Sequence, residues 1–582
     1  MNPHAKAFAF WRNLSPSQAI TATYEKLDAY KDPAMFITLR PKADVLSDAA
    51  ILEKAGAEGK SLFGLPFAVK DNIDVAGLPT SAACPDFAYM PKESAAVVKK
   101  LEAAGAICVG KTNLDQFATG LVGVRSPYGI PRNTLNPALV PGGSSSGSAV
   151  AVGMGAVAFS LGTDTAGSGR VPAALNGICG LKPSLGLLSA TGTVPACRSL
   201  DTISIFAKNV ADASEVAEIA QGFDAADFMS RTLPSARIAT VPPLFKVGIP
   251  QKDQLEFFGD ADAAKAFAAD IETLKSKGAQ IVELDFAPFF AVAKLLYEGP
   301  WVAERYHATK AFIESKPEAM HPVTRAITEG AKKFSAVDTF DALYKLANLK
   351  RKVAPTLDSV TILAVPSIPT IYTVEQLEAE PVKFNSNLGT YTNFVNLLDL
   401  AAFSVPVGTR ADGLPSSLTL IGKAGSDGLL AGIAQALQSG ELAAKSAAAH
   451  PSEVALAVVG AHLTGMPLNH ELTSRNARFL TLTETAPDYA LYALANTTPP
   501  KPGLQRVAAG EGTSIVVEVW ALTVEAFGSF VAGIPSPLGI GTLKLKDGSS
   551  VKGFIAEAEA LKGARDISSF KGWRAFVTAP KT

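Results

Sequence analysis

A glycine-rich, almost uncharged segment from residue 142 to 180 places the strongest constraint on how this chain can fold. Ten of its residues are glycines, and Asp164 and Arg170 are its only charged side chains. Flexible glycine–serine linkers are polar throughout, whereas this segment contains the apolar runs AVAVGMGAVAF and VPAALNGICG. We therefore expect a buried element in which backbones approach closely and several positions need a positive φ. The pattern predicts a helix over 148–157 and a strand over 158–162.

Two serine-containing turns flank this predicted helix and strand, namely Gly143-Ser144-Ser145 and Gly167-Ser168-Gly169. Backbone N–H groups at such glycine turns can converge on an anion, as an oxyanion hole requires. The turns therefore indicate a serine hydrolase. None of the six histidines lies between residues 5 and 306, which weakens a Ser-His-Asp arrangement without excluding it, since a distant histidine could fold back.

Lysine is the alternative base, and the segment GLPFAVKDNIDVAGLPT provides one. It predicts an apolar strand over 66–69 that ends in Lys70. A lysine at the end of such a strand is most often a surface residue, but burial would lower its pKa and leave a neutral base. Lys111 ends a second predicted strand and is a rival candidate.

The motifs GGSSSGS, GTDTAGSGR and GICGLKPS resemble the signature of the amidase signature family of serine hydrolases. The resemblance implies a Ser–cis-Ser–Lys triad, with Ser168 as nucleophile, Ser144 as bridging serine on a cis peptide, and Lys70 as base. Lys70 precedes Ser144 by 74 residues and Ser144 precedes Ser168 by 24, which matches the family. Ala166 and Gly169 depart from its commoner DxGGS(I/V)R pattern without affecting the triad.

The resemblance also implies how the reaction is supported around the nucleophile. The backbone N–H groups of Thr165, Ala166, Gly167 and Ser168 would stabilise the oxyanion. The two charged residues of the segment are expected to form a structural ion pair that braces this loop. No metal ion and no organic cofactor is needed.

The composition excludes several other classes of protein. The 582 residues include 53 basic and 54 acidic side chains, so there is no electrostatic case for nucleic acid or an anionic membrane. The longest apolar run, 149–162, is too short and glycine-rich to span a bilayer, and the first residues lack a signal-peptide pattern. Four scattered cysteines predict buried, reduced thiols. We therefore expect a cytoplasmic protein.

Two domains are expected from the way the pattern changes along the chain. Strand–helix alternation over 1–442 predicts an α/β domain with a mixed β-sheet covered by helices on both faces, and Ser15 predicts the N-cap of its first long helix. An alanine- and serine-rich linker is expected at 443–453. Residues 454–582 predict a smaller β-rich α+β domain with a hairpin turn at Lys546-Asp547-Gly548.

The second domain resembles the C-terminal domain of allophanate hydrolases, which is similar to the γ-glutamyl cyclotransferase fold. This branch of the family cleaves allophanate (urea-1-carboxylate), and the resemblance implies that Tyr297 and Arg305, eight residues apart, hold its carboxylate. A guanidinium can pair with a carboxylate bidentately, which a lysine cannot do. Gly299-Pro300 predicts a helix start that places Tyr297 just before it. On composition alone, an aromatic core contact and a solvated arginine remain open.

The resemblance further implies that the amidase product, a carboxylated carbamate, is decarboxylated in the second domain. His462 is the first candidate for that step, followed by His470 and Arg475, although a lone histidine after a strand is more often structural. Functional coupling to a urea carboxylase in urea degradation and assembly as a homodimer are expected on the same basis.

Two other functions stay open at this point. Another amidase, such as the glutamine amidotransferase component that acts on tRNA, would share the triad but should lack the second domain, and the chain has no basic patch for tRNA. A non-catalytic scaffold is the remaining alternative, and it would have no reason to keep Lys70, Ser144 and Ser168 together.

Overall fold

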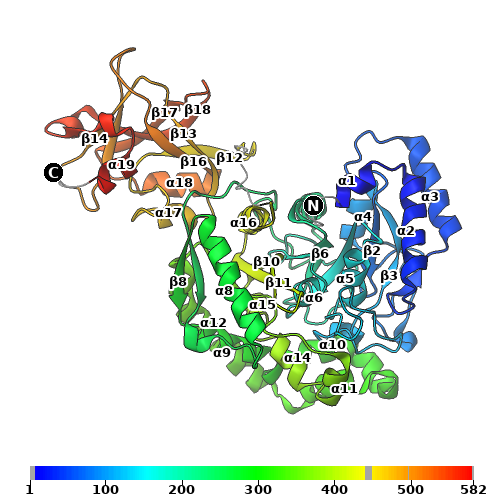
Figure 1. Cartoon of the computed structure of the whole chain (residues 1–582). Helices are drawn as coiled ribbons and strands as arrows, with labels where there is room; N and C mark the ends of the chain where they lie inside the picture. Colours follow the sequence, from blue (N-terminus) through cyan, green and yellow to red (C-terminus); the bar gives the residue numbers. More distant parts are fainter. Residues whose placement is uncertain (1–6, 440–447, 496, 580–582) are drawn as a thin grey trace.

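The computed structural model describes residues 7–439, 448–495 and 497–579. It has a large part built on one eleven-stranded sheet and a smaller, C-terminal part built on a five-stranded and a three-stranded sheet (Figure 1). In spatial order the strands of the large sheet are β1 (Phe36–Leu39), β3 (Ile107–Thr112), β2 (Pro66–Lys70), β4 (Phe159–Asp164), β6 (Thr202–Ala207), β5 (Cys179–Lys182), β10 (Leu400–Thr409), β11 (Pro415–Lys423), β9 (Ile362–Pro366), β7 (Phe245–Pro250) and β8 (Ala279–Leu284).

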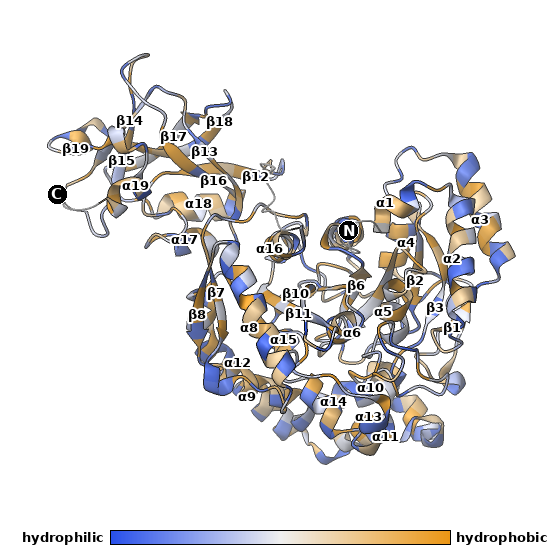
Figure 2. Cartoon of the chain, viewed as in Figure 1, coloured by the Kyte–Doolittle hydropathy of each residue, from blue (hydrophilic) through white to orange (hydrophobic). Residues whose placement is uncertain are grey.

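The large sheet is mixed. Strand β2 runs parallel to both β3 and β4, and β7 runs parallel to β8 and β9, whereas the strands between these two groups pair antiparallel. Figure 2 shows that apolar residues concentrate on the strands and on the inner faces of the helices around them. The expected fold class, a mixed sheet with helices on both faces, is confirmed.

The helices of the large part cover the sheet on both sides. They are α1 (Ala7–Arg12), α2 (Pro16–Tyr30), α3 (Lys42–Ala55), α4 (Ala96–Ala103), α5 (Ser146–Gly153), α6 (Val171–Leu175), α7 (Val210–Ala220), α8 (Ala261–Ser276), α9 (Ala287–Glu298), α10 (Val302–Ser315), α11 (Pro322–Glu329), α12 (Ala336–Asp358), α13 (Val374–Ala379), α14 (Lys383–Leu388), α15 (Phe394–Leu397) and α16 (Asp427–Ser439). Ser15 is the N-cap of α2, as expected, and it forms a capping box with Gln18. None of the helices in the described ranges is both long enough and apolar enough to cross a membrane.

Strand β2 shows how the sheet directs its side chains. Phe67 and Val69 pack in the apolar cluster that includes α4 and α7, whereas Ala68 packs in the opposite cluster with α2 and α5. Because successive residues of a strand point to opposite faces, Lys70 shares the face of Ala68. The side chain of Lys70 is thereby directed toward the segment that begins α5.

The glycine-rich segment forms the predicted helix and strand with shifted ends. Helix α5 begins at Ser146 and ends at Gly153, earlier than the predicted 148–157, because Gly155 takes a positive φ of +74°. Strand β4 extends to Asp164, since Asp164 still pairs with Thr202 of β6. The extra length of β4 brings its end to the second serine turn.

The C-terminal part contains β12 (Glu453–Val458), α17 (His470–Thr473), β13 (Arg478–Glu484), β14 (Tyr489–Ala493), β15 (Pro502–Arg506), β16 (Val516–Thr523), α18 (Val524–Ala532), β17 (Leu538–Lys544), β18 (Ser550–Ala556), β19 (Arg565–Asp566) and α19 (Trp573–Thr578). The five-stranded sheet has the order β13-β16-β12-β18-β17, and the other sheet the order β15-β14-β19. Strands β17 and β18 pair antiparallel around Lys546-Asp547-Gly548, which confirms the predicted hairpin.

The domain limits stay a proposal. The expected linker over 443–453 lies partly outside the described residues, since 443–447 are not among them. Residue Glu453 already belongs to β12. The four cysteines are free thiols and are buried, as expected.

Candidate active site

Lys70 is a fully buried lysine whose amine is surrounded by hydroxyl groups. Its Nζ donates to Ser144 Oγ at 2.8 Å and to Thr163 Oγ1 at 2.7 Å. Among the described residues it forms no ion pair with a carboxylate. Burial lowers the pKa of Lys70 to about 7, although the more distant charges of Asp115, Asp201 and Asp164 oppose this shift. The amine can therefore be neutral near physiological pH.

The rival lysine has a different environment. Lys111 Nζ forms a buried ion pair with Asp71 Oδ1 at 3.1 Å and donates to Thr80 Oγ1 at 2.9 Å. The ion pair joins two segments of the chain inside the protein, so this lysine is suited to hold structure together. Of the two lysines, Lys70 alone contacts a serine of the two turns.

Ser144 lies on the turn before α5, and the peptide bond from Gly143 to Ser144 is cis, as expected. The backbone N–H of Asp115 donates to the Ser144 carbonyl at 3.0 Å. A Cβ on residue 143 would lie 2.1 Å from Asp115 Oδ2 and 2.6 Å from the Gly123 nitrogen. Glycine is therefore required before Ser144, because the loop that begins at Asp115 packs directly against that backbone.

Ser168 lies on the second turn, just after β4, and is 3% exposed. Its Oγ donates to the Gly120 carbonyl at a long distance of 3.5 Å. No hydrogen bond joins Ser168 to Ser144 among those of the described residues. The structure thus brings Lys70 and Ser144 into contact and places Ser168 against the same loop, 115–125, that supports Ser144.

The backbone N–H groups around Ser168 are not all available to a substrate. The N–H of Gly167 already donates to Asp164 Oδ1 at 2.9 Å, whereas those of Thr165, Ala166 and Ser168 have no hydrogen-bond partner within the described part of the chain. The expected set of four oxyanion donors is therefore narrowed to three. The reason is that Asp164 uses the Gly167 N–H to hold the turn.

Thr165 is fixed by a carboxylate that the sequence did not single out. Its Oγ1 donates to Asp201 Oδ1 at 2.5 Å, and the backbone N–H groups of Ala196 and Cys197 donate to the same carboxylate. Burial raises the pKa of Asp201 to about 6, although these hydrogen bonds oppose the shift. Asp201 thereby holds the backbone that precedes the turn of Ser168.

Asp164 and Arg170 form the expected ion pair, and both side chains are fully buried. Arg170 NH2 and Nε donate to the two carboxylate oxygens at 2.9 and 3.0 Å, and the Gly169 N–H adds a bond at 2.9 Å. Burial alone would raise the pKa of Asp164, but the contact with Arg170 holds it below its usual value. The pair joins the residue before the Ser168 turn to the residue after it.

Tyr297 and Arg305 meet, although they do so from two helices. Tyr297 belongs to the last turn of α9 and lies just before α10, as predicted, because the break at Gly299 separates the two helices. Arg305 lies in the first turn of α10 and is 3% exposed, which excludes a solvated arginine. Its guanidinium carbon lies 5.4 Å from the centre of the Tyr297 ring.

The donors of Arg305 are unequally used. Its NH1 donates to Thr119 Oγ1 at 3.0 Å and to the Ala118 carbonyl at 3.4 Å, and NH2 reaches Tyr297 Oη at 3.4 Å. Its Nε has no partner, and no carboxylate pairs with this guanidinium within the described ranges. The Nε of Arg305 is thus a buried donor without a partner, beside an NH2 group that has only a long bond to Tyr297.

The loop 115–125 links the two halves of the site, and nothing in its sequence pattern singled it out. Asp115 accepts backbone hydrogen bonds from Val122, Gly123 and Arg125, and the buried Arg125 NH1 donates to the Thr119 carbonyl at 2.9 Å. The same loop therefore touches both serines and Arg305. The polar residues of this loop were the only signal that its sequence offered. Contacts between distant segments are needed to show what these residues hold.

His462 lies in the C-terminal part, beside a separate cavity of about 220 Å³ that Lys501 and Glu471 also line. Its Nε2 lies 3.0 Å from Glu471 Oε2, and its ring stacks on Phe554 at 5.1 Å. Burial lowers the pKa of His462, although Glu471 opposes the shift. The His462 ring therefore contacts Glu471 and Phe554 and also lines the cavity.

The two weaker candidates are not part of that cavity. His470 Nδ1 contacts the Pro467 carbonyl at 2.9 Å, and Arg475 NH1 donates to the Glu471 carbonyl at 2.8 Å. The structure thus separates both side chains from the space beside His462.

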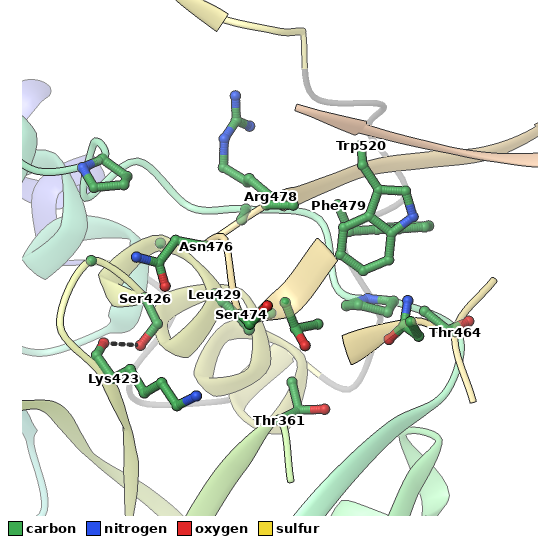
Figure 3. A pocket seen from close by; sticks show the side chains of 18 of the residues that line it. Thr361, Lys423, Ser426, Leu429, Thr464, Ser474, Asn476, Arg478, Phe479 and Trp520 are labelled. Atoms are coloured by element: carbon green, nitrogen blue, oxygen red, sulfur yellow. Dashed lines mark hydrogen bonds between the residues drawn. The ribbon is translucent and has the colours of Figure 1, made fainter. Parts of the chain in front are cut away.

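Another cavity, of about 240 Å³, lies between the large and the C-terminal parts. Figure 3 shows Lys423 and Ser426 on its side from the large part and Thr464 and Trp520 on the other. Neither Lys70 nor His462 lines it. This space is therefore distinct from both candidate sites.

The fold and the site define a hydrolase of the amidase type. The family model "Amidase" matches residues 18–431, so the chain belongs to the amidase family. The model "Allophanate hydrolase C-terminal domain" matches residues 454–578. The chain thus combines an amidase core with the C-terminal domain of allophanate hydrolases, as the sequence motifs predicted.

Known proteins resemble the chain over most of its length. It is 45% identical to urea amidolyase of Saccharomyces cerevisiae over 569 residues, which cover 93% of this chain and 31% of that protein. It is also 44% identical to urea amidolyase of Lachancea kluyveri over 578 residues, which cover 94% of this chain and 31% of that protein. The chain therefore spans about a third of the length of these two relatives.

A solved structure matches both parts together. Kluyveromyces lactis allophanate hydrolase superimposes with a TM-score of 0.78 at 42% identity, covering 99% of this chain and 98% of that one. The similarity therefore extends from the amidase core through the C-terminal domain.

The buried ion pair behind Ser168 predicts a large effect on stability. Asp164→Asn or Arg170→Met should each lower the free energy of unfolding of the large part by about 3–5 kcal/mol, because each leaves an unpaired buried charge. The double variant should lose less than the sum of the two. Urea denaturation followed by intrinsic fluorescence measures these changes.

The exposed pair between Lys99 and Glu93 is the matched control, with side chains 53% and 76% exposed. Glu93→Gln should leave the unfolding midpoint unchanged, since exposed ion pairs contribute little. A single Asp164 or Arg170 variant as stable as the parent would contradict a bracing role for the pair.

Proposed function

We propose that this chain hydrolyses allophanate through Ser168 as nucleophile, Ser144 as bridging serine and Lys70 as base. The observation that carries the proposal is the fully buried Lys70 amine, which has no contacting carboxylate among the described residues and lies 2.8 Å from Ser144 Oγ. The end-to-end similarity to Kluyveromyces lactis allophanate hydrolase supports the substrate. The test is ammonia release from allophanate compared with biuret, its uncharged analogue, and with glutamine.

The first half-reaction follows from the positions of the three side chains. Neutral Lys70 accepts the proton of Ser144, and Ser144 accepts the proton of Ser168 as Ser168 Oγ attacks the amide carbonyl. Ser168 has only a long bond to Gly120 to give up, so its hydroxyl can turn toward Ser144. The negative charge on the tetrahedral oxygen is stabilised by the N–H groups of Thr165, Ala166 and Ser168.

The reaction then completes in the reverse direction. The carbon–nitrogen bond breaks, and the proton held by Lys70 passes through Ser144 to the departing nitrogen, which leaves as ammonia. Water next attacks the acyl group on Ser168 and gives its proton to the same relay. Ser168 is released with its proton restored, and the product is a carbamate that carries a second carboxylate.

Arg305 is proposed to hold the carboxylate of the substrate. Thr119 and Ala118 fix NH1, which leaves Nε and NH2 as the two parallel donors that a carboxylate needs. Tyr297 lies beside the same edge, with its Oη 3.4 Å from NH2. A buried guanidinium without an acidic partner is costly unless an anion binds, so this site favours an anionic substrate over a neutral amide.

The C-terminal part is proposed to remove carbon dioxide from the dicarboxylated product. Support comes from the cavity beside His462, which Lys501 and Phe554 also line. A cation attracts a dianionic product, and an apolar wall favours loss of charge from a carboxylate. His462 is the residue proposed to contact the substrate of this step.

Three further proposals concern the partner enzyme, the pathway and the assembly of the chain. Coupling to a urea carboxylase is supported by the relative named urea amidolyase, of which this chain spans 31%. A place in urea degradation follows from that name. Assembly as a homodimer is expected from the resemblance.

The proposed triad predicts that Ser168→Ala, Ser144→Ala and Lys70→Ala each abolish most ammonia release from allophanate. Each should lower kcat on the order of a thousandfold or more, and double variants should lose little beyond the single ones, because the three groups act as one unit. Ser160→Ala is the control, since this serine is equally buried but its hydroxyl bonds only to the Ser148 carbonyl. Turnover near the parental rate in Ser168→Ala would refute the assignment.

The lowered pKa of Lys70 predicts how activity depends on pH. The neutral amine is the active form, so kcat/KM should rise about tenfold per pH unit below about 7 and level off above it. Initial rates of ammonia release between pH 5 and 9 measure this profile. A flat profile, with chemistry shown to be rate-limiting, would count against a lysine base.

Asp201 provides the control for this assignment, since its pKa of about 6 lies in the same range. The charge of Asp201 stabilises the ammonium form of Lys70, so Asp201→Asn should shift the rise to lower pH. If Asp201 itself produced the rise, the rise would instead disappear in this variant.

The unpartnered Nε of Arg305 predicts a change in specificity. Arg305→Lys keeps the charge but loses the paired donors, so kcat/KM for allophanate should fall roughly ten- to hundredfold, which corresponds to about 1.5–3 kcal/mol. Turnover of biuret should change much less, because biuret has no carboxylate to pair. If both Arg305→Lys and Arg305→Gln hydrolysed allophanate like the parent, the carboxylate would bind elsewhere.

A further inference from the structure

Arg125 is a second buried arginine beside the arginine proposed to bind the substrate. The residue is 2% exposed, and its guanidinium forms no ion pair with a carboxylate of the described residues. Burial lowers the pKa of Arg125, and the nearby charge of Arg305 adds to this shift, although the charge of Asp115 opposes it. A buried charge without a contacting counter-ion is costly, so the contacts of this guanidinium need an explanation.

Two main-chain carbonyls from separate parts of the chain hold the guanidinium of Arg125. Its NH1 donates to the Thr119 carbonyl at 2.9 Å, and its NH2 donates to the Pro381 carbonyl at 2.8 Å. Its Nε has no hydrogen-bond partner within the described ranges. Pro381 lies between α13 and α14, 256 residues after Arg125. The side chain therefore fastens the loop 115–125 to a distant segment and is itself held at both ends.

Thr119 is the residue at which the two buried arginines meet. Arg125 uses its carbonyl, whereas Arg305 NH1 donates to its Oγ1 at 3.0 Å and to the Ala118 carbonyl at 3.4 Å. The Thr119 hydroxyl donates in turn to the Phe117 carbonyl at 3.1 Å. A hydroxyl has one hydrogen and two lone pairs, so the oxygen of Thr119 is left to accept the bond from Arg305.

The backbone just before Thr119 depends on contacts of this kind. Phe117 and Ala118 both have left-handed conformations, with φ of +50° and +52°. Such conformations of residues other than glycine persist only where surrounding contacts impose them. The Phe117 N–H donates to the Ala82 carbonyl at 2.9 Å, and the bond from Arg125 fixes the next peptide group along. The two acceptors that Arg305 uses are thus held from both sides.

The contacts of Arg125 also distinguish a positioning role from direct binding of the substrate. A carboxylate is best bound by two parallel N–H donors. Both terminal nitrogens of Arg125 already donate to carbonyls, which leaves Nε alone. Arg305 instead has an unpartnered Nε beside an NH2 with only a long bond to Tyr297. Arg125 is therefore arranged to hold the loop, and Arg305 to bind the anion.

We propose that Arg125 is a positioning residue for anion recognition, which holds the Thr119 carbonyl and thereby fixes the orientation of Arg305. The inference rests on the proposed function, because it assigns a further residue to the carboxylate pocket of that reaction. It has a consequence for specificity: binding of small carboxylates depends on Arg125, whereas binding of neutral amides of the same size does not.

Binding of malonamate tests this inference without using the reaction. Malonamate is allophanate with CH2 in place of the central NH, and malonamide is its neutral counterpart. In the Ser168→Ala chain, which lacks the proposed nucleophile, isothermal titration calorimetry measures affinity alone. Adding Arg125→Gln should weaken malonamate binding roughly tenfold and malonamide binding less than about twofold. Malonamate affinity that Arg125→Gln leaves unchanged would overturn the inference.

A double-variant cycle separates positioning from direct contact. Arg305→Gln alone should weaken malonamate binding about ten- to hundredfold. Adding Arg125→Gln to that chain should cost less than about a further twofold, because the side chain that Arg125 orients is already gone. If the two losses multiply instead, Arg125 acts on the anion by itself, and the positioning role is wrong.

The link through Thr119 has its own test. Thr119→Val removes the hydroxyl but keeps the carbonyl that Arg125 binds, and it should weaken malonamate binding by a factor similar to that of Arg125→Gln. Thr119→Ser keeps the hydroxyl and should bind like the parent. Parental affinity in Thr119→Val would contradict the proposed route from Arg125 to Arg305.

Arg231→Gln is the matched control for loss of a carbonyl-bound arginine. Arg231 donates to the Leu185 carbonyl and pairs with Asp399, and neither partner belongs to the loop 115–125. This variant should keep the parental affinity for malonamate. Thermal unfolding midpoints are compared for every variant. If Arg125→Gln does not fold, Arg125→Lys gives the same comparison, because a lysine keeps the charge but has only one nitrogen for the two carbonyls.

Ammonia release separates failure of this inference from failure of the proposed function. In the chain with Ser168 intact, Arg125→Gln should raise KM for allophanate roughly tenfold and change kcat/KM for biuret less than about twofold. An equal loss with both substrates would indicate general damage to the site and refute the positioning of Arg305. A parent chain that binds malonamate through Arg125 and Arg305 but releases no ammonia from allophanate would refute the proposed function alone.

Discussion

The burial of one lysine amine among neutral hydroxyls is the interaction on which the rest of the site depends. A charged ammonium in this position is costly because the amine is buried and no carboxylate of the described residues touches it. The cost lowers the pKa of Lys70 to about 7. The other buried lysines meet different groups: Lys111 contacts the carboxylate of Asp71, and Lys182 donates to the carbonyls of Pro183 and Leu400. Of these three, Lys70 alone is arranged to exchange a proton with a serine.

The loop 115–125 connects the proposed proton relay to the arginine proposed to bind the substrate. It supports the Ser144 backbone through Asp115, meets Ser168 through Gly120, and fixes Arg305 through Thr119. The proposed proton relay and the arginine proposed to bind the substrate carboxylate are thus held by one short piece of backbone. Because the distance between reacting carbonyl and carboxylate in a small substrate is fixed, holding both recognition groups on one rigid loop favours productive binding.

The two parts of the chain divide the proposed reaction between two unlike environments. Proton transfer and amide cleavage use hydroxyls, backbone N–H groups and a neutral amine inside the large sheet. The space beside His462 instead combines an imidazole, the Lys501 cation and the Phe554 ring. The cavity between the two parts contains neither set of residues, so the two chemistries occupy separate sites. A dicarboxylated intermediate would therefore leave one site before it meets the other.

The sequence by itself determined the elements that depend on local pattern: the mixed sheet with helices on both faces, the capped helix α2, the β17–β18 hairpin and the two serine turns. Its motifs and their spacing also identified Lys70, Ser144 and Ser168 as the proposed triad. It did not reveal Thr163, Thr119 or Asp201, because a buried hydroxyl or carboxylate acquires its role only from partners far away in the chain. The tertiary structure alone decided that Gly167 N–H is occupied by Asp164. It likewise decided that α9 and α10 bring Tyr297 and Arg305 together, since a helix break shows where a chain turns but not which side chains then meet.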